Sequence, residues 1–284
     1  MTTEQIYIHN YRVIEKMGKG AFSTVFKGVH RVSQKTVALK VSREKQTHET
    51  KILAYLNREF VDGVPTLLWY GRFGDNTCIA TTFYEATLQN YVESIWSTNF
   101  DPCLKVLGIC VQLITIMENM HAAFIVHSDI KPDNFMVDSG GHVVAIDFGL
   151  SSLYYNVEKD VYKENKQCEH LIGSPKFASY NLHVGNSISP RDDMMSLGYM
   201  MLSLFHIQIP WSNIPEQESE LPLYDIRHPS NIKRAELKRD LREYLRVTYV
   251  DKYLVPYFEQ VSSLEFKERP DYKSYREIFS TKGT

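Results

Sequence analysis

The sequence predicts an α+β fold in which a sheet with one helix comes first and a larger, mostly helical part follows. Short strand-like runs separated by turn residues fill roughly the first 80 residues. After Glu85 the pattern changes, and Leu104 to Phe124 carries apolar residues at helical spacing. No long linker separates the two parts, so we expect a boundary near residue 84 and a ligand cleft at that seam.

The first part is predicted to contain five strands and one helix. The strands are expected at residues 11–14, 23–29, 36–41, 67–71 and 77–81. Gly18 and Gly20 indicate a tight turn between the first two strands. The run 47–57 favours a helix, because its apolar residues fall on one face; they are Ile52, Leu53 and Leu56.

The second part is predicted to be helical, with strong helix patterns at residues 104–124, 193–205 and 233–250. The stretch 213–231 is rich in Pro and Glu, and we expect it to be an exposed excursion. No repeat or low-complexity tract interrupts this order.

The composition is that of a folded globular protein, with 43% apolar and 23% charged residues among 284. The formal net charge is −2, so no global field favours nucleic acid or anionic lipid. The four cysteines lack metal-site spacing, and we expect reduced thiols. Neither a signal peptide nor an apolar run of about 18 residues is found, so we expect a soluble intracellular protein, cytoplasmic or nuclear, with no membrane segment.

The glycines of the first turn lie between two strands. A dinucleotide site would need a helix directly after its glycines, and the pattern G-x-x-x-x-G-K-[ST] is absent. A nicotinamide-binding fold and a phosphate-loop NTPase are therefore disfavoured. Taken alone, the two glycines fit an ordinary hairpin as well as a phosphate-binding loop.

Lys40 ends an apolar strand about twenty residues after that turn. Such a lysine is either solvated or, in a cleft, neutralises phosphate oxygens while a carboxylate holds it. Glu49 on the following helix is the candidate partner, and Glu44 is the alternative.

The most specific pattern is a set of two acids, a lysine and an amide: Asp129, Lys131, Asn134 and Asp147. Asp129 can accept the proton of an attacking hydroxyl, and Lys131 can stabilise charge on a transferred phosphoryl group. Asn134 and Asp147 can hold magnesium ions that bridge phosphates. The alternative, two polar turns with solvated acids, does not account for all four residue types at this spacing.

The order of these motifs resembles the signature of eukaryotic protein kinases over about residues 11 to 279. Within that superfamily the sequence is most similar to the casein kinase 1 family, with the vaccinia-related kinases as a more distant sister group. The similar segments are His127 to Phe135, Ala178 to Asn181, Arg191 to Tyr199 and Phe266 to Tyr272.

The resemblance implies one bilobal kinase domain over residues 1–284. Its small antiparallel sheet lobe with one main helix would span about 11–84, and its larger helical lobe 85–279. It implies ATP and Mg²⁺ as cofactors, Asp129 as the catalytic base, and Asp193 as a brace of the catalytic loop. It also implies a set of ATP-binding residues, which are Met17, Gly18, Lys19, Gly20, Ala21, Val25, Ala38, Lys40, Glu49, Thr81, Thr82, Phe83, Tyr84 and Asp147. Thr81 would lie behind the adenine, and residues 82–84 would form the hinge.

Two departures from the family pattern concern the loop and its regulation. Ser23 stands at the third glycine position, which should stiffen the loop slightly. Ser128 replaces the arginine that normally receives an activation-loop phosphate. We therefore predict activity that does not require phosphorylation of residues 150–180.

The resemblance also implies protein substrates that are acidic or already phosphorylated near the target Ser or Thr. Lys176 stands where one of the basic residues that read such substrates is expected. The second is not assigned, because the insertion at 215–225 brings three acids into its neighbourhood: Glu216, Glu218 and Glu220. A basic cluster beyond it, which comprises Lys233, Arg234, Lys238 and Arg239, is expected to be a solvated helix face rather than a nucleic-acid patch or nuclear signal.

Two other functions remain open from the sequence. A catalytically weak pseudokinase would act as a scaffold or binding module, with Ser23, Ser128 and the short Lys40–Glu49 connection as its support. A small-molecule kinase would keep the ATP chemistry, but the stretch 173–181 favours a peptide platform. The oligomeric state is not indicated.

Overall fold

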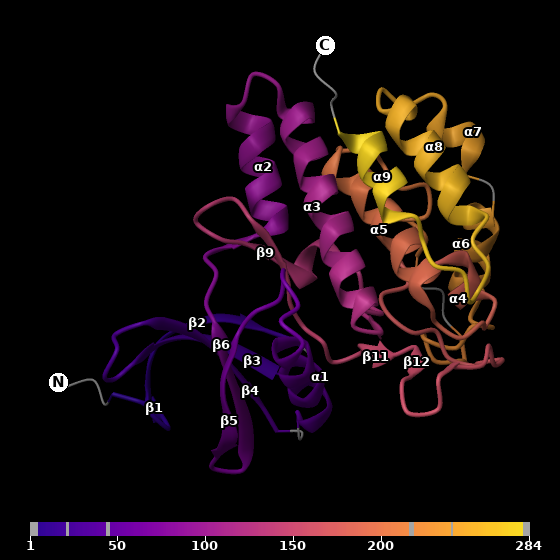
Figure 1. Cartoon of the computed structure of the whole chain (residues 1–284). Helices are drawn as coiled ribbons and strands as arrows, with labels where there is room; N and C mark the ends of the chain where they lie inside the picture. The colour runs from indigo at the N-terminus through magenta and orange to yellow at the C-terminus, as the bar shows by residue number, and fades with distance from the viewer. Residues whose placement is uncertain (1–4, 21–22, 44–45, 216–218, 240, 281–284) are drawn as a thin grey trace. The chain divides into compact units, whose positions relative to one another are not determined.

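The computed structural model describes residues 5–20, 23–43, 46–215, 219–239 and 241–280. The chain forms two compact units, Met1–Ala86 with Met136–Gly149, and Thr87–Phe135 with Leu150–Thr284. The first holds the main sheet and one long helix, and the second holds most of the helices (Figure 1). This confirms the predicted α+β class. The sequence suggested a single division near residue 84, whereas the structure adds 136–149 to the first unit.

The main sheet of the first unit has six antiparallel strands in the order β1-β2-β3-β4-β6-β5. Their bounds are Tyr7–Ile8 (β1), Tyr11–Lys19 (β2), Ser23–His30 (β3), Thr36–Ser42 (β4), Leu67–Phe73 (β5) and Asn76–Thr82 (β6). The helix α1 (Thr47–Arg58) packs on β5 and buries the predicted apolar face.

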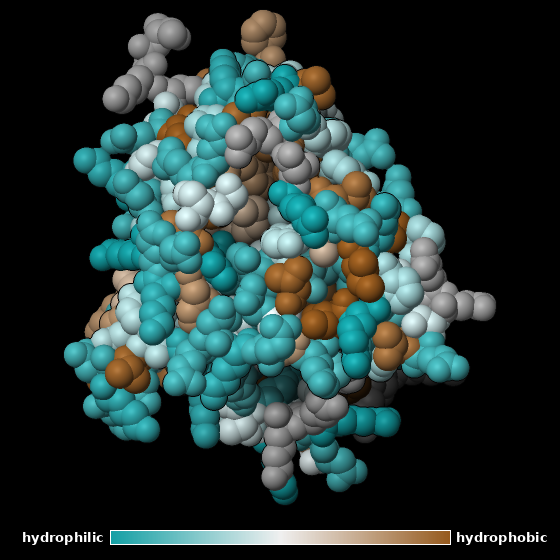
Figure 2. Space-filling model, turned by 90° about the vertical axis from the view of Figure 1, so that its right-hand side faces the viewer, coloured by the Kyte–Doolittle hydropathy of each residue, from teal (hydrophilic) through white to brown (hydrophobic). Residues whose placement is uncertain are grey.

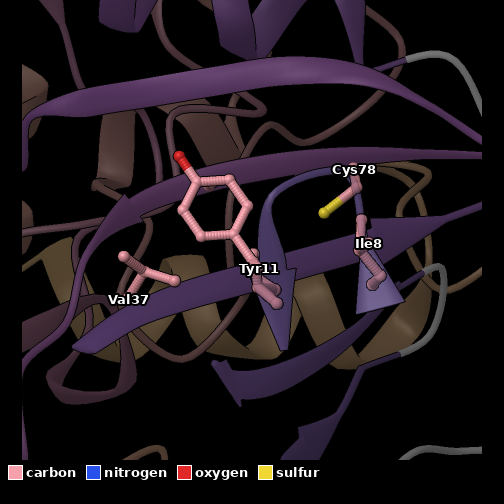
Figure 3. Close-up of a cluster of buried hydrophobic side chains, with 6 residues drawn as sticks. Ile8, Tyr11, Val37 and Cys78 are labelled. Carbon is pink, nitrogen blue, oxygen red and sulfur yellow. The ribbon is translucent and has the colours of Figure 1, made fainter. Parts of the chain in front are cut away.

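One face of this sheet is apolar because alternate residues of a strand point to the same side. Val37 on β4 and Cys78 on β6 join Ile8 and Tyr11 in a buried cluster (Figure 3). Their strand neighbours Leu39 and Ala80 complete it. The other side of β4 is thereby left to carry Lys40.

A second, three-stranded sheet has the order β10-β9-β7. Its strands are Ala86–Thr87 (β7), Phe135–Val137 (β9) and Val143–Ala145 (β10). β9 and β10 flank a turn in which Asp138 accepts hydrogen bonds from the amides of Gly140 and His142, each at 2.8 Å. This hairpin ends two residues before Asp147.

The second unit is built on α3 (Pro102–Ala122) and α5 (Pro190–Leu204), which are largely buried. The helices around them, side by side in Figure 1, are α2 (Leu88–Thr98), α8 (Asp251–Ser262) and α9 (Tyr272–Phe279). The smaller helices are α4 (Tyr180–His183), α6 (Pro229–Arg239) and α7 (Arg242–Leu245). Within the described ranges α3 is the one helix long and apolar enough to cross a membrane, but half of that window is buried, as in a core helix.

The main helices begin where the sequence places capping residues. The side chain of Asp101 accepts the Leu104 amide at 3.1 Å, directly before Pro102 opens α3. At α5, Ser189 and Asp192 form a reciprocal capping box around Pro190. These starts lie within a few residues of the predicted ones, because capping chemistry is local.

Two predictions about the second unit are wrong. The single helix predicted at 233–250 is instead α6 and α7, followed by a turn before α8. Val247, Thr248 and Val250 are β-branched and favour a helix weakly. The stretch 213–231 is not wholly exposed, because Asp225 and His228 are buried in its second half.

The surface agrees with the composition. The face in Figure 2 is mostly hydrophilic, with a few hydrophobic residues gathered near its middle. The four cysteines are free thiols, and Cys110 is fully buried in α3.

The packing of α5 against α8 depends on Gly198. A Cβ at this position would lie 2.7 Å from Cζ of Phe258 and 2.9 Å from Cε1 of Tyr257. We expect Gly198→Ala to lower the free energy of unfolding by about 1–3 kcal/mol through overpacking, measured by urea denaturation. Gly108→Ala in α3 is the control, because no atom lies within 4 Å of its added Cβ and alanine favours a helix. Equal stability of both variants would contradict this account.

Candidate active site

Lys40 lies at the centre of an ion-pair group in the first unit. Its Nζ donates to Glu49 Oε1 at 2.9 Å and Oε2 at 2.8 Å, and to Asp147 Oδ1 at 2.9 Å. Glu49 lies in the first turn of α1. Of the two candidate partners, Glu49 makes the contact, and Glu44 lies outside the described residues.

Burial and charge act against each other in this group. Burial alone would lower the pKa of Lys40, but the carboxylates of Glu49 and Asp147 outweigh it and raise that pKa. Burial raises the pKa of Glu49, with Lys40 opposing the shift. The ammonium is therefore held charged, as a group that binds phosphate must be.

Asp147 follows β10 in a left-handed backbone conformation, with φ of 62°. A non-glycine residue in this region is uncommon and is found often at functional sites. Phe148 is buried beside it, and β10 is tied to the unit by Ala145 N donating to Gly63 O at 2.8 Å. The side chain of Asp147 remains 46% exposed, so it can take further partners.

The strand register brings the predicted loop residues next to Lys40. Gly18 on β2 pairs with Val25 on β3, and Val25 pairs with Lys40 on β4. Met17 and Lys19 flank Gly18 in β2. Gly20 N donates to Ser23 O at 2.8 Å, and the predicted site residue Ala21 lies outside the described residues.

The predicted hinge follows β6. Ala38 pairs with Thr81, and the Thr82 amide donates to Thr66 O at 3.1 Å. Phe83 lies under Nζ of Lys27, 5.0 Å from the ring centroid. Among the described residues, the backbone N–H groups of Phe83 and Tyr84 donate no hydrogen bond.

The second unit carries a dense network around Asp129. Its Oδ2 accepts from Lys131 Nζ at 2.6 Å and from Asn134 Nδ2 at 2.9 Å. Its Oδ1 accepts from the Ser174 amide at 2.9 Å and the Ser174 hydroxyl at 2.8 Å. The short 3₁₀ helix Pro132–Asn134 turns Asn134 back toward Asp129, whose backbone oxygen it also contacts at 2.8 Å.

Asp193 on α5 holds the backbone of this loop, as predicted. Its Oδ2 accepts from His127 N at 2.6 Å and from His121 Nε2 at 3.0 Å, and its Oδ1 from Ser128 N at 3.0 Å. All of these side chains are buried. Tyr272 on α9 completes the chain, with its hydroxyl 2.7 Å from His121 Nδ1.

Ser174 is a residue that the motif search missed. It follows Gly173, whose φ is 81° and whose added Cβ would lie 2.4 Å from Ser128 O. Only glycine fits there, and this close approach brings Ser174 to Asp129. Ser128, whose backbone oxygen lies against Gly173, is itself in a strained backbone conformation with φ of 73°. The signal in the sequence was the glycine of the stretch 173–181.

A lysine held by two carboxylates and a loop with a hydrogen-bonded acid are both found in ATP-dependent phosphotransferases. The sequence model of the protein kinase domain matches residues 11–245, so the chain belongs to the protein kinase family. This family uses ATP, typically with Mg²⁺.

Three curated relatives are casein kinase I proteins of yeasts, which confirms the predicted resemblance. Casein kinase I homolog RAG8 of Kluyveromyces lactis is 27% identical over 277 residues, 95% of this chain and 50% of that protein. Casein kinase I homolog 1 of Saccharomyces cerevisiae has the same figures, and homolog 2 is 27% identical over 280 residues, 94% of this chain and 48% of that protein. The chain spans about half the length of the curated relatives it matches.

We expect Asp193→Asn to destabilise the second unit, because an amide cannot accept from all three buried donors. The free energy of unfolding should fall by about 1–3 kcal/mol, measured by urea denaturation. Asp133→Asn is the control, since Asp133 is an exposed acid in the same loop and should change stability by less than about 0.5 kcal/mol. A wild-type stability for Asp193→Asn would show that the carboxylate does not hold the loop.

Proposed function

We propose that the chain is a serine/threonine protein kinase that transfers the γ-phosphate of ATP to hydroxyls of protein substrates. The observation that carries this proposal is the Asp129 carboxylate, aimed by Ser174, Lys131 and Asn134. We further propose that the two units act as the lobes of one kinase domain, about 11–84 and 85–279.

Nucleotide binding falls to residues of the first unit in this proposal. Lys40 would bind the α- and β-phosphates, and its ion pair with Glu49 supports this role. The hinge residues 82–84 would hold the adenine edge through backbone groups, with Thr81 behind it. The loop and strand residues would line the rest of the nucleotide, and they are Met17, Gly18, Lys19, Gly20, Ala21, Val25 and Ala38.

Asn134 and Asp147 supply oxygen ligands of the kind that Mg²⁺ prefers. The Nδ2 of Asn134 donates twice to Asp129, so its Oδ1 is the atom for a metal. Asp147 brings an exposed carboxylate. When bound, Mg²⁺ neutralises charge on the phosphate oxygens.

The transfer itself asks two things of the catalytic loop. Asp129 accepts the proton of the substrate hydroxyl, while Lys131 stabilises negative charge on the phosphoryl group. The substrate oxygen then bonds to the γ-phosphorus, the bond to the β–γ bridging oxygen breaks, and ADP leaves. Ser174 fixes the carboxylate for this step, since it donates to Oδ1 twice.

Other functions have less support. The comparisons do not favour the pseudokinase alternative, and each loop residue that phosphoryl transfer needs is present. The match to the protein kinase domain disfavours a small-molecule kinase, and the stretch 173–181 fits a peptide platform. We propose an intracellular location, in the cytoplasm or nucleus, as expected from the sequence.

Acidic or phosphorylated substrates are our proposed preference. Lys176 is exposed beside Ser174 and is a fitting contact for an anionic substrate. Lys233 is paired with Glu236 at 3.0 Å, so we do not propose it as the second contact. Glu216 and Glu218 lie outside the described residues.

The catalytic role of Asp129 predicts the outcome of one substitution. Asp129→Asn should lower phosphate transfer from radiolabelled ATP to casein by roughly 100-fold or more, because the amide cannot accept the proton. Binding of a fluorescent ATP analogue should be unchanged. Asp133→Asn in the same loop should transfer at the wild-type rate, and equal transfer by Asp129→Asn would rule out this assignment.

Activity should not depend on phosphate in the segment 150–180. Ser128 stands in place of an arginine, and the Ser151 hydroxyl is already buried on His127 O at 3.0 Å. After phosphatase treatment, verified by mass spectrometry, turnover should stay within about two-fold, since no arginine before Asp129 receives the phosphate. Recovery of activity only upon rephosphorylation would contradict this.

A further inference from the structure

The basic cluster on α6 is not the solvated helix face that the sequence predicts. Lys238 is 4% exposed and Arg234 is 8% exposed. Their helical spacing, i and i+4, places both on one side of α6. Lys233 and Arg239 lie on the exposed part of the helix. The buried half of the cluster therefore has a role inside the unit.

Lys238 reaches two backbone carbonyls of the segment next to the catalytic loop. Its Nζ donates to Pro175 O at 2.9 Å and to Ala178 O at 2.6 Å, and it lies 2.9 Å from His183 Nε2. The rings of Tyr199 and Trp211 cover it, each centroid 5.1 Å away.

Burial without a carboxylate is costly for a lysine. Within the described part of the chain, no acid pairs with Lys238. Burial lowers the pKa of Lys238, and Arg234 lowers it further. Burial, together with Lys238, lowers the pKa of His183 to about 2, so this imidazole is neutral. The hydrogen bonds from Lys238 to the carbonyls of Pro175 and Ala178 offset part of this desolvation cost.

Trp211 fixes the same segment from a second direction. Its Nε1 donates to Lys176 O at 2.7 Å. The amides of Phe177 and Ala178 both donate to Ser174 O at 2.9 Å. The carbonyls of residues 174, 175, 176 and 178 are thus all hydrogen-bonded.

The segment 174–178 begins with Ser174, which orients the Asp129 carboxylate. Ser174 donates to Asp129 and directly precedes Pro175. The ring of Pro175 restricts its φ to about −65°, so the carbonyl that Lys238 holds is linked to Ser174 by a stiff connection. A shift of the Pro175 carbonyl would therefore move Ser174 and change its hydrogen bonds to Asp129.

We propose that Lys238 and Trp211 form a platform clamp that positions residues 174–178 and, through Ser174, the Asp129 carboxylate. Both are positioning residues, since neither reaches the reacting atoms. The proposal rests on the proposed kinase function and adds the residues that set the geometry of its base. It gives the buried Lys238 of the α6 cluster a positioning role.

The test is a double-mutant cycle measured as kcat on casein. Lys238→Met keeps the side-chain length without a donor, and Ser174→Ala removes the hydroxyl contact. Each should lower kcat on the order of 10-fold with the KM for ATP unchanged, because misplacing a catalytic group slows the reaction. The kcat of the double variant should be little lower than that of the worse single variant, because Lys238 acts on Asp129 through Ser174. Lys233→Met, on the exposed side of α6, is the matched control and should match wild type.

The clamp would be overturned if the fold-decrease in kcat of the double variant equalled the product of the two single decreases. A wild-type kcat for Lys238→Met would also overturn it. If circular dichroism shows that Lys238→Met does not fold, Trp211→Phe is used in its place. This substitution removes the Nε1 donor to Lys176 O and keeps an aromatic ring. The same cycle with Ser174→Ala then applies.

Hydrogen exchange tests the clamp without any activity. The Phe177 and Ala178 amides should exchange faster in Lys238→Met and Trp211→Phe than in wild type or Lys233→Met. Unchanged exchange would overturn the clamp. If the wild type transfers no phosphate, the proposed kinase function fails, while this measurement still decides whether Lys238 and Trp211 fix the segment.

Discussion

The structure of the catalytic loop depends on one buried carboxylate. Asp193 accepts the buried amides of His127 and Ser128, and leaving a buried donor unsatisfied is costly. Ser128 is held in a left-handed conformation that a serine rarely adopts, and these hydrogen bonds stabilise it. The position of Asp129, the next residue, follows from this constraint. His121 extends it to α3, and Tyr272 extends it to α9.

A second set of contacts aims the Asp129 side chain once its backbone is fixed. Both oxygens are engaged, one by Ser174 and the other by Lys131 and Asn134. A carboxylate with so many donors has little freedom to rotate, which supports the proposal that it meets one substrate hydroxyl. The segment that brings Ser174 is itself fixed by α6, so the order of the site extends well beyond its motif.

Local patterns in the sequence predicted much of this. The main strands and the buried face of α1 follow from near neighbours along the chain, and Lys40, Asp129 and Asp147 each stand in a short motif. The contacts that the sequence did not reveal join distant segments, such as Lys238 with Pro175. A lysine in a charged run indicates a solvated side chain, and only the fold shows that carbonyls and aromatic rings surround it. The end of the helical pattern within 233–250 was missed because the prediction gave too little weight to the weak helix preference of its β-branched residues.

The central proposal is that Lys40, Asn134, Asp147 and Asp129 serve one nucleotide. A crystal structure with Mg²⁺ and a non-hydrolysable ATP analogue tests it most directly. The account predicts Lys40 on the α- and β-phosphates, the oxygens of Asn134 and Asp147 on the metal, and the Asp129 carboxylate facing the γ-phosphate. A nucleotide held without Lys40, or with Asp129 out of reach of its γ-phosphate, would contradict it.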